Sequence, residues 1–144
     1  MSWPPPSLPQ SSANQARFWE EIKGADGIVR QLQWTARVEG SFDTPNGKAM
    51  TMSQYLGRGA TSRGRMTITP ALTTVVSDVP YLKDANDKEA VIQGIINLQN
   101  ALKGVSGLTW NFPNASVSAR DYVNNVRLPI LPPPKPSPIL THPG

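Results

Sequence analysis

Few residues of this chain could carry out covalent or metal chemistry. The 144-residue sequence has no cysteine and a single histidine, His142, which lies between a threonine and a proline. Transition-metal sites need several His, Cys or clustered carboxylate ligands, and a nucleophilic Ser or Cys needs a histidine within hydrogen-bonding reach. We therefore expect no metal site and no Ser-His-Asp or Cys-His arrangement in the body of the chain.

Arginines remain as candidates for ligand binding, and three of them are close in sequence. Arg58, Arg63 and Arg65 lie in and beside the glycine-punctuated stretch 57–64 (GRGATSRG). A phosphate-binding loop would lead a strand directly into a helix N-terminus, and that order is not present. The net charge of +4 comes from interspersed charges, whereas a nucleic-acid binder gathers its cations on one face. We expect these arginines to form ion pairs within a strand–turn–strand unit, with nucleic-acid binding as the less favoured alternative.

The clearest predicted strand covers residues 28–39 (IVRQLQWTARVE). One side of this strand carries the apolar residues Leu32, Trp34, Ala36 and Val38, and the other carries Gln31, Gln33, Thr35 and Arg37. This alternation is typical of an antiparallel strand covered on one face, with Trp34 in the core. The Asp26-Gly27 pair favours a turn, so residues 18–23 are predicted to be an earlier strand in a hairpin with this one.

Further strands are predicted at 50–56 and 64–69, with a loop over 40–47 and an irregular passage after the second. A long helix is predicted over 86–103, with Asn86 as N-cap and Glu89 as its capping-box partner. Its apolar stripe is Val91, Ile95, Leu98 and Leu102, widened by Ile92. A short helix is predicted from Ser118, with Asp121 three residues later. The sequence therefore predicts an α+β fold, an antiparallel or mixed sheet with one long and one short helix on one face.

Prolines divide the chain into one domain and two tails. Four of the fifteen prolines precede Gln10 and seven lie from Pro129 onward. Because proline removes amide donors and fixes φ, we expect disordered tails at 1–15 and 128–144 around a single domain at 16–127. Residues 131–136 contain a P-x-x-P pattern of the kind that SH3-type partners bind, although a low-complexity tail is the favoured interpretation of this segment. The first ten residues do not resemble a signal peptide, and no apolar run is long enough to cross a membrane.

The segment 61–102 resembles a known enzyme family. Its Ser62-Arg63-Gly64 motif, its Pro80-Tyr81 pair, and Asp84 with Asp87 around the start of the long helix are similar to the carboxy-terminal substrate-binding region of glucose-methanol-choline (GMC) flavin oxidoreductases. The later Asp121-Tyr122-Val123 resembles the acidic-x-Tyr-hydrophobic segment that precedes the family's catalytic histidine. Across 18–125 the chain looks most like the flavin domain of fungal cellobiose dehydrogenases.

The resemblance implies a role on the substrate side of an FAD-dependent enzyme that oxidises CH-OH groups of sugars or alcohols. The chain has no G-x-G-x-x-G motif for FAD, and a proline-rich stretch follows Val126 where the family places its histidine. We therefore expect a truncated chain that is not catalytically competent alone, retains no flavin, and binds sugar weakly or not at all. The family also implies a secreted protein, although no signal peptide is present, and Asn114-Ala115-Ser116 is an N-glycosylation sequon.

In that family the polar face of the sheet lies over the flavin and forms the substrate pocket. By this resemblance Arg37 is the best substrate-binding candidate, together with Gln33 and Thr35, because a guanidinium group can hold sugar hydroxyls. The alternative for Arg37 is an exposed strand arginine that pairs with Glu39 or another neighbour. Arg30 is a weaker alternative, and Arg63 and Arg65 are expected to be structural. The other hypothesis is a non-enzymatic interaction protein that uses the domain as a scaffold and the 131–136 segment as its partner ligand.

Overall fold

A computed structural model describes residues 15–41 and 44–126. In chain order the elements are β1 (Gln15–Lys23), β2 (Val29–Ser41), β3 (Thr44–Leu56), β4 (Arg65–Ile68), β5 (Thr74–Asp78), α1 (Ala85–Leu102) and α2 (Ala119–Asn125). The α+β prediction is confirmed, with antiparallel sheets and one long and one short helix. The predicted tails, including His142 and the 131–136 segment, lie outside the described residues, except for Gln15, which begins β1.

The main sheet has three antiparallel strands in the order β1-β2-β3. The predicted first hairpin is confirmed, and Gly27 adopts a φ of 78° at its turn, a conformation that glycine reaches without steric cost. The predicted loop over 40–47 is wrong, because β2 continues to Ser41 and β3 begins at Thr44, where these two residues pair. The register shifts between Glu39 and Ser41, and ladder pairing prevails over the local turn preference.

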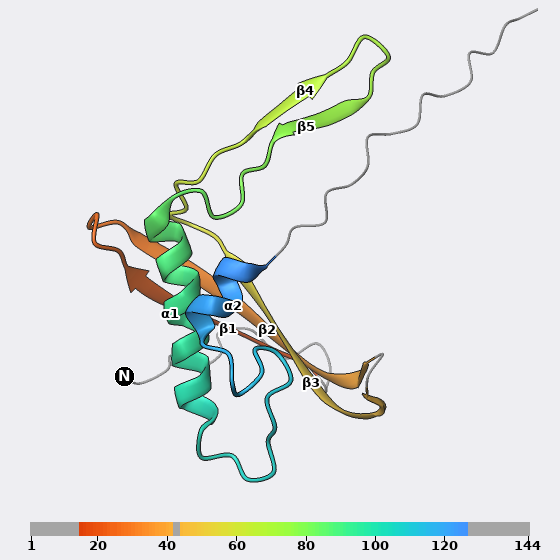
Figure 1. Ribbon diagram of the computed structural model, residues 1–144, viewed down its shortest axis with the longest axis vertical. Helices are drawn as coiled ribbons and strands as arrows, with labels where there is room; N and C mark the ends of the chain where they lie inside the picture. Colours follow the sequence, from red (N-terminus) through yellow and green to blue (C-terminus); the bar gives the residue numbers. More distant parts are fainter. Residues whose placement is uncertain (1–14, 42–43, 127–144) are drawn as a thin grey trace, which may run out of the picture.

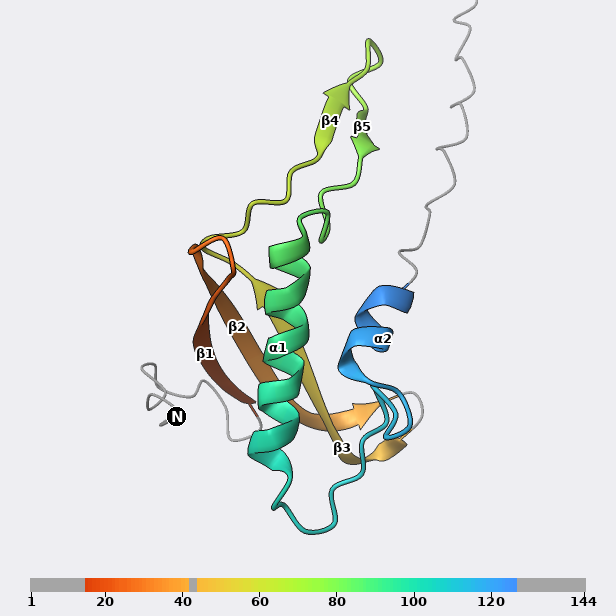
Figure 2. The ribbon, with the colours of Figure 1, turned by 60° about the vertical axis from the view of Figure 1, so that its left-hand side comes forward.

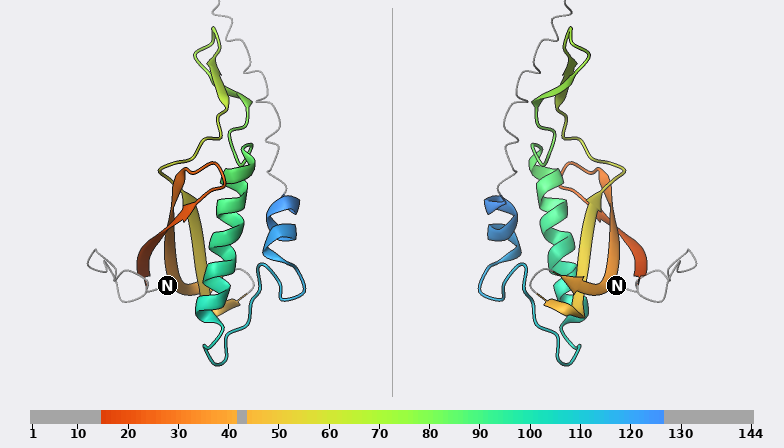
Figure 3. Two further views of the ribbon diagram at one scale, coloured as in Figure 1. Left: turned by 90° about the vertical axis from the view of Figure 1, so that its left-hand side faces the viewer. Right: turned by 90° about the vertical axis from the view of Figure 1, so that its right-hand side faces the viewer.

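Both helices lie on the same side of this sheet, with α1 against the strands and α2 beside α1 (Figures 2 and 3). The core between them consists of Trp34, Ile92, Ile95, Leu98, Ala119 and Val123. Trp34 is 2% exposed and stacks on Phe18, with ring centroids 6.3 Å apart, so its predicted place in the core is confirmed. Ile92, Ile95 and Leu98 of the predicted stripe are buried.

The helix caps were predicted with mixed success. The N-cap of α1 is Asp84 and not Asn86, because the Asp84 carboxylate accepts hydrogen bonds from the backbone amides of Asn86 and Asp87. Asp84 is the better cap because its carboxylate places a negative charge at the helix N-terminus, whereas Asn86 offers only a neutral amide. For α2 the prediction is confirmed, because Ser118 Oγ accepts the Asp121 amide and donates to the Asp121 carboxylate at 2.7 Å.

Strands β4 and β5 form a separate two-stranded hairpin that stands away from the sheet and helices (Figures 1 and 2). We define this hairpin, residues 65–78, as the arm. Strand β4 was predicted, but its expected place in a strand–turn–strand unit with the 50–56 strand is wrong, because β4 pairs with β5 in a sheet of its own. Strand β5 fell in the passage predicted to be irregular, although Val75 and Val76 have high strand propensity. All residues of both strands are exposed, including Ile68 at 72%. Among the described residues, no helix is long and apolar enough to span a membrane.

Candidate functional site

The face of the main sheet opposite α1 carries the three predicted substrate-binding residues. Gln33, Thr35 and Arg37 alternate with buried Leu32 and Trp34, so they point away from the helix. Their cross-strand partners are Trp19 and Tyr55 for Gln33, Arg17 and Ser53 for Thr35, and Gln15 and Thr51 for Arg37. No described helix or strand covers this face (Figure 3). We refer to the residues of these three cross-strand rows as the open face.

A shallow hollow of about 290 Å³ lies on the open face. Thr35 and Arg37 line it together with Arg17 and Tyr55, whereas Gln33 lies in the next row and does not line it. The structure therefore brings two of the three predicted residues together. Arg17 and Tyr55 were not predicted, because their place beside Thr35 depends on the register of two other strands.

The open face offers chemistry suited to a polyhydroxylated ligand. Two guanidinium groups donate in fixed planar geometry to hydroxyl or carboxylate oxygens. Tyr55 is 54% exposed and presents both an aromatic ring and a hydroxyl group. This combination of stacking surface and planar donors can bind and orient a ligand.

Arg30 was wrongly considered a ligand-binding alternative, because its side chain is fully buried. Its guanidinium donates to both carboxylate oxygens of Asp26, at 3.0 and 2.8 Å, and through Nε to Asp87 at 2.6 Å. Asp84 lies 3.8 Å from Nη2. Hydrogen bonds to Asp26 and Asp87 raise the pKa of Arg30 above its usual value. Arg30 is therefore a fixed counter-ion that joins the start of β2 to the start of α1.

Asp87 is the second fully buried member of this cluster. It accepts hydrogen bonds from the amide of Thr61 at 2.9 Å and the amide of Ser62 at 2.6 Å, as well as from Arg30. Burial alone would raise the pKa of the Asp87 carboxyl, but the hydrogen bonds from Ser62, Arg30 and Thr61 outweigh it and hold the pKa well below its usual range. We define Arg30, Asp87, Asp26, Thr61 and Ser62 as the buried cluster.

The buried cluster gives a physical role to the Ser62-Arg63-Gly64 motif. Ser62 Oγ accepts the amide of Asp84 at 3.0 Å, so the motif is attached to both aspartates at the start of α1. Gly64 is required for close approach, since a Cβ atom there would meet the carbonyl oxygen of Asp78 and, at 2.7 Å, the nitrogen of Pro80. The motif therefore fixes the loop, the arm and the helix relative to one another.

The remaining arginines near the motif lie at the surface. Arg58 forms an ion pair with Glu21 at 2.6 Å, which confirms the expected ion-pair role for this residue. Arg63 donates to the carbonyl oxygens of Ala60 and Ser62, both at 2.9 Å, within its own loop. Arg65 begins β4 and pairs in register with Asp78. Arg58 and Arg63 thus have structural contacts within the body.

These contacts also test whether the loop could hold the pyrophosphate of FAD, the cofactor implied by the resemblance. A pyrophosphate site needs backbone amides that point at the ligand from a loop or a helix N-terminus. Here the amides of Thr61 and Ser62 are bound to Asp87, and the first amides of α1 are bound to Asp84. The loop at Thr61 and Ser62 and the start of α1 therefore do not fit the pyrophosphate of FAD. Among the described residues there is also no group of three His, Cys, Asp or Glu residues that could hold a metal ion.

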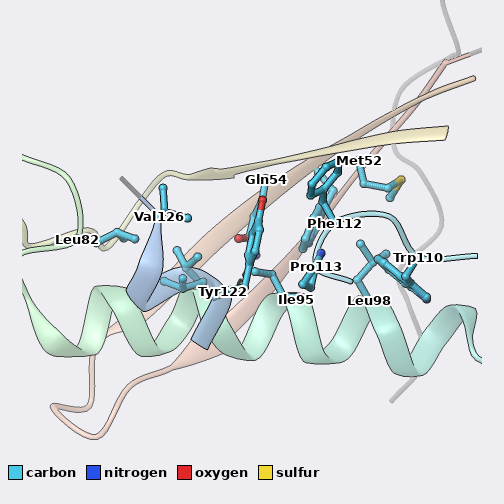
Figure 4. Close-up of a pocket in the computed structure, with 13 residues that line it drawn as sticks. Met52, Gln54, Leu82, Ile95, Leu98, Trp110, Phe112, Pro113, Tyr122 and Val126 are labelled. Carbon is cyan, nitrogen blue, oxygen red and sulfur yellow. Dashed lines mark hydrogen bonds between the residues drawn. The ribbon is translucent and has the colours of Figure 1, made fainter. Parts of the chain in front are cut away.

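A second concavity lies on the helix side of the sheet, between α1, α2 and β3. Its volume is about 260 Å³, and Figure 4 shows its side chains in a row from Leu82 and Val126 at one end to Trp110 at the other. Aromatic side chains contribute much of the lining, namely Trp34, Trp110, Phe112 and Tyr122. We refer to this concavity as the aromatic groove. It was not predicted, because it forms only where three elements meet.

The predicted glycosylation residue, Asn114, is exposed in the segment between the two helices. Its side-chain oxygen accepts hydrogen bonds from the Ser116 amide at 2.9 Å and the Ser116 hydroxyl at 3.0 Å. The sequon therefore lies on an accessible turn.

No protein-family model matches this chain.

Proposed function

We propose that this chain is the substrate-side portion of an FAD-dependent oxidoreductase of the GMC type, acting on a sugar or alcohol CH-OH group. In this proposal the open face holds the substrate, and the flavin and the proton-accepting base are supplied from outside the described residues. The cofactor would take the hydride while a base takes the hydroxyl proton. The chain's own contribution is binding and orientation.

The observation that carries the proposal is the composition and exposure of the open face. An uncovered sheet face normally carries polar side chains. On this face an exposed tyrosine, Tyr55, and two arginines are gathered around one hollow. Arginine donors can bind neighbouring sugar hydroxyls, and a tyrosine ring can pack on the apolar face of a sugar ring. The sequence resemblance of residues 18–125, which first indicated this face, supports the same assignment.

The test is a titration of the ¹⁵N-labelled full chain with cellobiose, followed by amide chemical shifts. We expect weak binding, with a Kd of about 1 mM or higher, and shifts concentrated at Thr35, Arg37 and Tyr55. Arg37→Ala should remove most of the response, since a lost charge-assisted hydrogen bond weakens binding about tenfold or more. Arg120→Ala is the matched control, because that arginine lies on α2 on the other side of the sheet.

Two results would contradict the proposal. One is a cellobiose titration whose shifts lie away from the open face, or whose shifts on the open face Arg37→Ala leaves unchanged. The other is tight retention of FAD by the purified chain, seen as visible flavin absorbance after gel filtration. Such retention would mean that the chain holds the cofactor itself and is not restricted to the substrate side.

A further inference from the structure

We propose that the aromatic groove is a binding site for the proline-rich segment 128–134 of this same chain. The groove is open to solvent on the helix side of the molecule, and Phe112 on its wall is 72% exposed. Large apolar side chains that remain exposed around a concavity mark a surface that is covered by a partner. The assignment concerns the side of the sheet opposite the open face, and it does not depend on the sugar-binding proposal.

The chemistry of the groove matches a polyproline II segment. Pro-rich segments dock into aromatic-lined grooves, because their rings pack on flat aromatic surfaces and their backbone needs no ladder of amide bonds. Four aromatic side chains line this groove. Residues 128–134 (LPILPPP) contain four prolines, three branched aliphatic residues and no charge. The cavity of about 260 Å³ is slightly below the usual range of about 300–1,000 Å³ for small-molecule pockets, and it suits a few side chains better than a large ligand.

The point of attachment places the segment at the groove. Val126, the last described residue, lines the groove and is 52% exposed. Its φ of −60° and ψ of 111° lie near the polyproline II region, so the chain leaves α2 already extended. Figure 4 shows Val126 at the Leu82 end, with the row of lining side chains continuing toward Trp110. The segment therefore begins at one end of its site.

The length of the segment is also sufficient. The groove residues from Val91 to Leu98 lie along α1 over an axial distance of about 10 Å. Four residues of polyproline II span about 12 Å, so residues 128–134 can follow this part of the groove. Because the segment is covalently joined to Val126, its effective concentration is in the millimolar range, and even a weak site is occupied. An SH3-type partner would then have to compete with the groove for the prolines that both would bind.

Spin labelling provides a direct test, since the chain contains no cysteine. A nitroxide label on Lys135→Cys lies next to the segment. In the ¹⁵N-labelled full chain we expect it to broaden the amide signals of Trp110 and Tyr122 more than those of Thr35 on the open face. A second version of the labelled chain carries Pro129→Ser, Pro132→Ser, Pro133→Ser and Pro134→Ser. It should lose this selective broadening and keep the spectrum of the body. A label on Ala71→Cys in the arm is the position control.

The groove side is tested with Phe112→Ala, which removes an exposed side chain and should reduce the broadening at Trp110. The proposal is overturned if the Ser-substituted segment broadens the groove signals as strongly as the native one, or if neither broadens them. A mixing experiment tests for a second copy: ¹⁵N chain without a nitroxide is combined with ¹⁴N chain that carries one. Broadening of the groove signals in this mixture would also overturn the proposal, because the segment of a second copy would then occupy the groove. Changes in the amide chemical shifts of the groove residues on addition of cellobiose would likewise overturn the proposal, because the groove would then be a sugar-binding site.

Discussion

Arg30 donates its Nε hydrogen to Asp87 Oδ1 across 2.6 Å, and both side chains are completely buried. The two residues are 57 positions apart in sequence. The contact joins the start of β2, which leads to the open face, to the first turn of α1, which forms one wall of the aromatic groove. This buried ion pair therefore contributes, together with the apolar core, to the relative placement of the two concave surfaces.

Removing one member of this pair should be strongly destabilising. Asp87→Ala leaves the Arg30 charge buried with one partner fewer and leaves the amides of Thr61 and Ser62 without their acceptor. We expect a loss of about 3–5 kcal/mol in the free energy of unfolding, measured by urea denaturation. Asp87→Asn should lose less, because its amide oxygen can still accept one of these bonds. Glu89→Ala, which removes an exposed ion pair with Arg120, is the control and should cost at most about 1 kcal/mol. Equal losses for Asp87→Ala and Glu89→Ala would contradict this account.

The same carboxylate should make stability dependent on acid pH. The pKa of Asp87 is lower in the folded protein than its ordinary value of 3.8, so the folded state favours the charged form. Its stabilisation is therefore complete above the unfolded pKa and is lost as the pH falls toward the folded pKa. We expect the free energy of unfolding to decrease below about pH 5, with a shallower decrease in Asp87→Asn. Asp26 and Asp84, whose pKa values are also lowered, leave a residual slope in that variant. If the free energy of unfolding fell with pH identically in the native chain and in Asp87→Asn, Asp87 would be excluded as the source of the pH dependence.

The alternation of residues along β2 was sufficient to predict which side of the strand is buried, but it did not reveal the ion pair. Arg30 has the same parity as Leu32 and Trp34, which places it on the buried face. A buried arginine requires a partner, and no local pattern identifies Asp87 on a distant helix as that partner. In the sequence, Asp84 and Asp87 belonged to the family resemblance, and Asp87 also suited the first turn of a helix, but neither pattern indicates a contact with Arg30. Their role depends on tertiary contacts.

The site was predictable to the same limited extent. Period-two alternation placed Thr35 and Arg37 on one face, and the structure shows them beside one hollow. Arg17 and Tyr55 complete that hollow through strand register, which the sequence of β2 alone does not determine. The aromatic groove depends on the packing of α2 against α1. Strand β5 was missed because it pairs only with β4 and shows no apolar–polar alternation.

The close approach of α1 to the sheet depends on Gly94. A Cβ atom there would overlap the side-chain amide of Gln54 and would lie 2.5 Å from Leu32 Cδ1. We expect Gly94→Ala to lower the free energy of unfolding by about 1–3 kcal/mol through overpacking, although alanine favours a helix by about 1 kcal/mol. Gly104→Ala, at a position with open space around it, should be neutral or slightly stabilising. Thermal and urea unfolding of both variants would check this, and a stabilised Gly94→Ala protein would show that the helix can shift away from the sheet.

The exposed arm should promote association between chains. Met66, Ile68 and Val76 lie on one face of this two-stranded hairpin, and the outer edge of each strand is unpaired within the described part of the chain. Such an edge with an apolar face is a template for pairing with another chain. Because Ile68 is 72% exposed, Ile68→Lys should change the free energy of unfolding by no more than about 0.5 kcal/mol while reducing self-association in sedimentation velocity experiments. Thr67→Lys adds the same charge to the opposite face of β4 and should reduce association less. Equal effects of the two lysines would indicate general charge repulsion, and the apolar face of the arm would then have no specific part in association.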